Sequence, residues 1–132
     1  MPISLTVAPY AAVLGLLGAL LTINVIINRV PARVHAGDGG VAGLAQAIRA
    51  HANFVEQAPI ALIVIALAEA AGARTLVIHG LGAALLVSRL ASALALSRSL
   101  GQTPLRQFGG GTAVLIAIAA ALALLLAVLG VR

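Results

Sequence analysis

The sequence is short of charge, aromatic side chains and sulfur. Only 8% of its 132 residues are charged and 2% are aromatic, and it contains no cysteine and no tryptophan. Without cysteine, disulfides, thiolate metal sites and cysteine nucleophiles are excluded. A soluble domain normally carries about 25% charged residues, so this chain has too little polar surface to face water on all sides. The scarcity of charge therefore indicates a membrane protein.

The charge that is present is mostly positive, with a formal net value of +5. All the basic residues are arginines, and they are spread singly through apolar sequence. A nucleic-acid site needs clustered cations and stacking aromatic side chains, so we expect no nucleic-acid partner. The three histidines show no metal-binding spacing such as His-Glu-x-x-His, so we expect no metal site either.

Long apolar runs dominate the chain, which is 62% hydrophobic. A helix needs roughly 20 apolar residues to cross the hydrocarbon core of a bilayer. The sequence predicts one domain, 1–132, that is an all-α membrane protein with a four-transmembrane-helix bundle. The expected spans are about 3–28, 44–71, 75–97 and 107–130. The first run has no basic segment before it, so we interpret it as a retained helix and not as a signal peptide.

Arginines in the connectors predict the orientation. Four spans place the first and third connectors at one end of the bundle and both termini at the other. The first end has four arginines and the second has two: Arg29, Arg33, Arg98 and Arg106 against Arg74 and Arg132. Because positive residues are enriched in cytoplasmic connectors, we expect the first and third connectors to be cytoplasmic.

Three polar residues lie together within the second predicted span. Arg49, Asn53 and Glu56 are separated by four and then three residues, so they fall in one narrow sector of a helix. An ionised group at the bilayer centre costs at least ~2.5–3.5 kcal/mol, so this stripe must face protein or a water-filled cleft.

The third predicted span brings another arginine to the same depth. At about 1.5 Å per residue, Arg49, Asn53 and Arg89 all lie roughly 8–14 Å below the cytoplasmic end, and Glu56 is deeper. Two arginines, one carboxylate and one amide leave a positive excess that suits an anion. A purely structural ion pair that holds helices in register stays an alternative, although desolvation offsets much of the attraction of a buried pair. A proton relay or small transporter that uses Glu56 is another.

The stretch from Arg49 to Pro59 resembles the second-helix signature of the MAPEG family, the membrane-associated proteins in eicosanoid and glutathione metabolism. That signature has an arginine, an asparagine four residues later, a glutamate three after that, and a nearby proline. Several further segments are similar to small bacterial members: Gly37-Asp38-Gly39-Gly40, Gly72-Ala73, Arg89-Leu90 and Arg106.

The resemblance implies a homotrimer in the bacterial inner membrane, with glutathione as co-substrate bound between neighbouring subunits. It implies that Arg49, Asn53 and Glu56 hold the carboxylates and the α-amino group of glutathione, together with the first-helix arginine, Arg29. Arg89 matches the third-helix arginine assigned to the thiol and is the expected catalytic residue. The second substrate would be a small lipophilic electrophile or lipid hydroperoxide that arrives from the bilayer lipids.

One departure from the family pattern keeps a second interpretation open. Catalytic members place tyrosines in the third helix, whereas the only tyrosine here is Tyr10. Ser88 and Ser92 are the hydroxyls available near Arg89. Some members of the same fold are not catalytic, so the alternative is a membrane protein that binds glutathione or lipid without chemistry.

Overall fold

Four long helices make up the structure, a computed structural model that describes residues 5–131. They are α1 (Ala8–Ala32), α2 (Ala42–Ala70), α3 (Thr75–Arg98) and α4 (Pro104–Val128). Each helix is long and apolar enough to cross a membrane, and residues 5–131 contain no strand. The predicted all-α bundle of four membrane helices is therefore confirmed.

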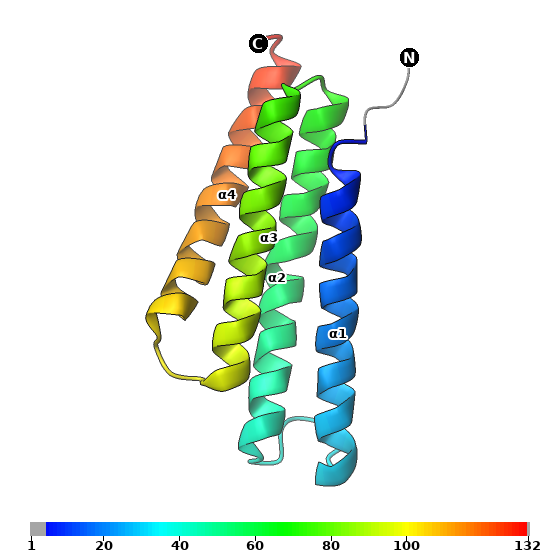
Figure 1. Cartoon of the computed structure of the whole chain (residues 1–132), viewed down its shortest axis with the longest axis vertical. Coiled ribbons are helices and arrows are strands. Elements are labelled where there is room, and N and C mark those ends of the chain that lie inside the picture. The colour runs from blue at the N-terminus through cyan, green and yellow to red at the C-terminus, as the bar shows by residue number, and fades with distance from the viewer. Residues whose placement is uncertain (1–4, 132) are drawn as a thin grey trace.

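The helices run antiparallel, one after the next (Figure 1). The α1–α2 and α3–α4 connectors lie at one end, and the start of α1, the α2–α3 turn and the end of α4 lie at the other. The inner pair, α2 and α3, separates α1 from α4, and within the described chain those outer helices do not touch. The first and third connectors thus share one end, as predicted. Their cytoplasmic location stays a prediction.

The helix ends differ from the predicted spans by a few residues. The first helix continues past Arg29 to Ala32, and its last turn keeps that arginine close to the negative end of the helix dipole. The last helix begins at Pro104, because proline suits the first helical turn and the Thr103 side chain accepts a hydrogen bond from the Arg106 amide at 3.2 Å. Residues 3 and 4 of the first predicted span, and Arg132, lie outside the described residues.

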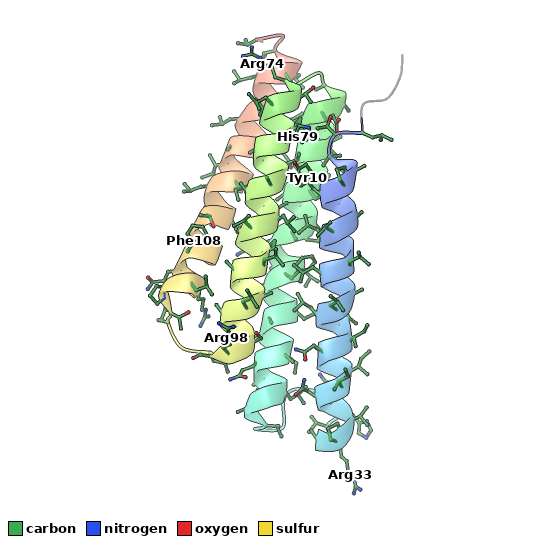
Figure 2. The ribbon with its side chains drawn as sticks, in the orientation of Figure 1. Tyr10, Arg33, Arg74, His79, Arg98 and Phe108 are labelled. Carbon is green, nitrogen blue, oxygen red and sulfur yellow. The ribbon has the colours of Figure 1, made fainter. Side chains whose placement is uncertain are left out.

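Polar contacts fasten α1 to the bundle at the end away from its connector. The Glu69 carboxylate, in the last turn of α2, accepts hydrogen bonds from the backbone amides of Thr6 at 2.6 Å and Val7 at 3.0 Å. These amides precede α1, so the Glu69 carboxylate acts as an N-terminal cap for that helix. Nearby, the Tyr10 hydroxyl lies 2.9 Å from Nδ1 of His79 on α3 (Figure 2).

Small residues bring the helices close together. The largest buried aliphatic side chains include Ile65, Ile78 and Leu85, and glycines or alanines occupy many of the other contact positions. At Gly109 on α4, a Cβ atom would lie only 2.3 Å from Oγ of Ser92 on α3. This close approach positions the polar cluster described next.

Candidate functional site

The outer part of the predicted site is an ion pair on α2. Nη1 of Arg49 lies 3.3 Å from Oε1 of Glu56, two turns along the same helix. Both side chains are about half exposed on the surface of the single chain, at 44% and 50%. Because both partners belong to one helix, this pair cannot hold two helices in register. The simplest structural explanation of the stripe therefore does not apply to Arg49 and Glu56.

The inner part of the predicted site is centred on Arg89, which is only 1% exposed. Its Nη1 donates to Oδ1 of Asn53 on α2 at 3.1 Å, and its Nη2 donates to Oγ of Ser88 at 2.9 Å. Nη2 also donates to the carbonyl of Gly109 on α4 at 2.7 Å, and the Ser88 hydroxyl donates to the same carbonyl at 2.8 Å. Arg89 therefore connects three helices and lies level with Asn53, as the depth estimate predicted.

The acceptors around Arg89 are all neutral. The carboxylate of the described chain that lies nearest in sequence to Asn53 is Glu56, and it pairs with Arg49 instead. Among residues 5–131, Nε of Arg89 is also buried without a hydrogen-bond partner, and so is Oε1 of Gln57. A buried cation without a counter-ion favours any anion that approaches it, because little solvent screens the interaction.

A groove of about 340 Å³ runs beside the outer ion pair. Its wall on α2 includes Arg49, and its other walls come from both connectors at that end of the bundle. The lining residues are Gly37, Asp38, Ala45, Ile48, Arg49, Ala52 and Leu100. Its size is at the lower limit of the range usual for small-molecule sites.

Arg29 does not join the other predicted residues. Its Nη1 donates to the carbonyl oxygens of Val34 at 3.1 Å and Gly37 at 3.0 Å, which folds the first connector back over the end of α1. Since Gly37 lines the groove, Arg29 supports one wall of it from behind. The structure therefore divides the five predicted residues into the Arg49–Glu56 pair, the Asn53–Arg89 contact, and Arg29.

Arg106, which was not among the predicted site residues, lies close to the groove. Its Nη1 donates to the carbonyls of Leu100 and Gly101, and its side chain is partly exposed. Leu100 lines the groove, so Arg106 lies behind the groove wall opposite α2. The sequence signal that could have found it is its position shortly before three consecutive glycines, in what the structure shows to be the first turn of α4. Ser88 and Ser92, the hydroxyls available near Arg89, are both buried against α4.

Comparison with known proteins identifies the protein family of this chain. The MAPEG family model matches residues 7–127, which is nearly the whole chain. The chain belongs to the MAPEG family. The MAPEG resemblance inferred from the Arg49–Pro59 stretch is therefore confirmed.

Two similar MAPEG relatives carry the same name. The chain is 41% identical over 83 residues to the inner membrane protein YecN of Escherichia coli strain K12, and equally to that of Escherichia coli O6:H1 strain CFT073. The matched segment covers 63% of this chain and 63% of each relative. No solved structure matches. With four membrane-crossing helices and these relatives, the chain is an inner membrane protein, as predicted.

Proposed function

We propose that this MAPEG protein is a glutathione-dependent transferase or peroxidase that acts on lipophilic electrophiles, and that it works as a homotrimer. The observation that carries the proposal is the half-exposed pair of Arg49 and Glu56 beside a groove, on a helix that crosses the membrane. Charged groups at such depth need a polar partner. Glutathione offers two carboxylates and one ammonium group, which match an arginine, an amide and a glutamate.

A second copy of the chain would complete the site. The polar sector of α2 is open on the single chain, and covering it with a neighbouring subunit removes it from lipid. In this arrangement Arg49 and Asn53 bind the carboxylates, and Glu56 accepts from the α-amino group. Arg29 contributes through donors other than Nη1, which holds the connector.

Arg89 would act on the thiol through its charge. A free thiol with a pKa of ~8.5 is only a few per cent thiolate at pH 7, and the thiolate is the nucleophile. Arg89 donates to Oδ1 of Asn53 at 3.1 Å, so its charge would act through space on a sulfur beyond Asn53, for which we take a distance of about 7 Å. At that distance and an effective dielectric of ~20, a cation stabilises the thiolate by about 2.4 kcal/mol, which lowers the thiol pKa by about 1.7.

Arg106 is the competing arginine. It is partly exposed and lies behind the groove wall, so its charge would be closer to solvent and to a ligand in the groove than that of the buried Arg89. Separate substitution distinguishes the two. Loss of thiolate in Arg106→Ala alone would assign the thiol to Arg106 and leave Arg89 a structural role.

The first experiment is calorimetric titration of the detergent-purified protein with glutathione. The wild type should bind, and Arg49→Ala should lose binding by tenfold or more, because a charged hydrogen bond contributes ~1.5–3 kcal/mol. Arg98→Ala is the matched control, since it removes an exposed arginine at the same end of the bundle. Equal binding by wild type and Arg49→Ala would exclude this groove as the glutathione site.

The second experiment follows the bound thiolate by ultraviolet difference absorbance. If Arg89 acts through its charge, Arg89→Lys should keep most of the thiolate and Arg89→Met should lose it. Identical thiolate fractions in both variants and the wild type would remove Arg89 from the mechanism.

The alternative is a MAPEG protein that binds glutathione or lipid without turning it over. The absence of tyrosine from α3 favours it, because Tyr10 lies on α1 and contacts His79. Saturable binding without thiolate and without product, across a panel of lipophilic electrophiles, would support this alternative over the enzyme.

A further inference from the structure

A second depression, of about 270 Å³, lies at the connector end of α1. Half of its lining is basic and half is aliphatic, and the residues are Ile26, Arg29, Val30, Arg33, Val34 and His35. It shares no lining residue with the groove beside Arg49. Nothing in the proposed glutathione chemistry uses Arg33 or His35.

The backbone holds these basic side chains around the aliphatic ones. Arg33 follows the last turn of α1 with a φ of 54°, a left-handed conformation that turns the chain sharply. Arg29 then holds the returning segment by donating to the carbonyls of Val34 and Gly37. His35 is thereby brought back toward the face of α1 that carries Ile26 and Val30.

The basic groups of this depression have no acidic partner. Among residues 5–131, no carboxylate lies within ion-pair distance of Arg29, Arg33 or His35. The carboxylate of Asp38, the acidic residue of this connector, accepts from the Gly40 amide. The depression therefore has positive charge to offer to an external anion.

Its aliphatic wall continues onto the exposed surface of α1. Ile26 is 54% exposed and Val30 is 72% exposed, one turn apart on the helix. Arg33 extends beyond the end of α1, away from the bundle (Figure 2). The depression thus has a cationic rim at the end of a membrane-crossing helix and an apolar wall that runs along that helix toward the middle of its span.

We propose that this depression binds the phosphate headgroup of an anionic phospholipid, with one acyl chain along Ile26 and Val30. Arginine matches phosphate oxygens through paired N–H donors, which makes the phosphate the natural partner of Arg33. His35 adds a second donor on the same rim. A free phosphate would leave the apolar wall unused, whereas a phospholipid occupies both parts. Anionic lipids also concentrate at the cytoplasmic leaflet, on which this end is predicted to lie.

The test is lipid retention measured by native mass spectrometry of the detergent-released protein. The protein is mixed with phosphatidylglycerol or with phosphatidylcholine of the same acyl chains. We expect preferential retention of phosphatidylglycerol, a loss of about fivefold in Arg33→Ala, which removes one cation, and a further loss in Arg33→Ala/His35→Ala, which also removes the second hydrogen-bond donor. Arg98→Ala is the control, because it removes an exposed arginine at the same end but outside the depression.

Further measurements distinguish binding of the lipid from binding of other anions, and loss of binding from loss of folding. Val30→Asn should weaken retention of the long-chain lipid, and an excess of glycerol phosphate should not displace it. Circular dichroism should show an unchanged melting temperature for these exposed positions, and Arg33→Lys, which keeps the charge, should retain more lipid than Arg33→Ala. Equal retention of both lipids, equal losses in Arg33→Ala and Arg98→Ala, or displacement by glycerol phosphate would each overturn the proposal.

Discussion

Three consecutive glycines near the start of α4 allow a direct test of the packing around Arg89. At Gly109, an added Cβ would lie 2.3 Å from Oγ of Ser92, 2.9 Å from the Ser92 backbone nitrogen and 3.0 Å from the Ser88 carbonyl oxygen. The serine hydroxyl can rotate away, but the two backbone atoms cannot. Gly109→Ala must therefore push α4 away from α3.

The cost can be worked out from these contacts. Overpacking of a tight interface costs about 1–3 kcal/mol. Separation also weakens the two hydrogen bonds that Ser88 and Arg89 donate to the Gly109 carbonyl, each with a net contribution of about 1 kcal/mol. Alanine is better than glycine inside a helix by about 1 kcal/mol, which offsets part of the loss. We expect Gly109→Ala to lower the free energy of unfolding by about 2–4 kcal/mol.

The neighbouring glycines are matched controls with the opposite expected sign. A Cβ at Gly110 or Gly111 would meet nothing within 4 Å, so alanine there should stabilise the helix by about 0.4–1 kcal/mol. Far-UV circular dichroism during titration with a denaturing detergent is the suitable assay, because the chain has no tryptophan and one tyrosine. If Gly109→Ala were as stable as Gly110→Ala, the proposed close contact of α3 with α4 would be refuted.

Three other predictions address the far end of the bundle and the thiol. Gly82→Ala places a Cβ 2.5 Å from the Tyr10 ring and should cost about 1–3 kcal/mol of unfolding free energy. In a double-mutant cycle with Tyr10→Ala, the two losses of unfolding free energy should not add, and additive losses would contradict the contact. Glu69→Ala should cost about 1–2 kcal/mol of unfolding free energy by detergent titration, because it removes the acceptor of two amides before α1. An unchanged free energy of unfolding would argue against the cap. If Arg89 lowers the thiol pKa by about 1.7, glutathione bound to the wild type should form thiolate with a midpoint near pH ~7, rising toward ~8.5 in Arg89→Met; the same midpoint in both would count against it.

The sequence predicted the number of helices because apolar length alone decides membrane crossing. It predicted the helix ends less well, because these depend on local caps. The last helix starts at Pro104, capped by Thr103, whereas the predicted span began at residue 107. The first helix continues through Arg29, because a membrane helix tolerates an arginine in its last turn. Contacts such as those of Glu69 with the amides of Thr6 and Val7 join residues far apart in sequence, so no local sequence pattern predicts them.

The site was partly predictable for a similar reason. Arg49 and Glu56 lie on one helix, and helical periodicity fixes their relative position. Depth in the bilayer was enough to bring Asn53 and Arg89 to one level. It could not show that Arg89 turns inward to Gly109, because that depends on how α3 and α4 pack. With 14 glycines in the chain, small residues permit close approach at many positions, and sequence alone does not select one.

The position of the outer ion pair also bears on how the protein assembles. Glu56 lies at the middle of α2, a helix that crosses the membrane, and its side chain is half exposed on the single chain. Facing lipid, it and Arg49 would each cost about 2.5–3.5 kcal/mol, which one exposed ion pair does not offset. A neighbouring subunit that covered this sector, as proposed above, would remove the cost and would close the groove around a ligand. A binding protein without catalysis would need the same cover, so the oligomeric state does not separate the two proposed functions. Measuring the thiolate fraction of glutathione added to the protein would distinguish the two proposed functions, because only an enzyme needs the thiol deprotonated.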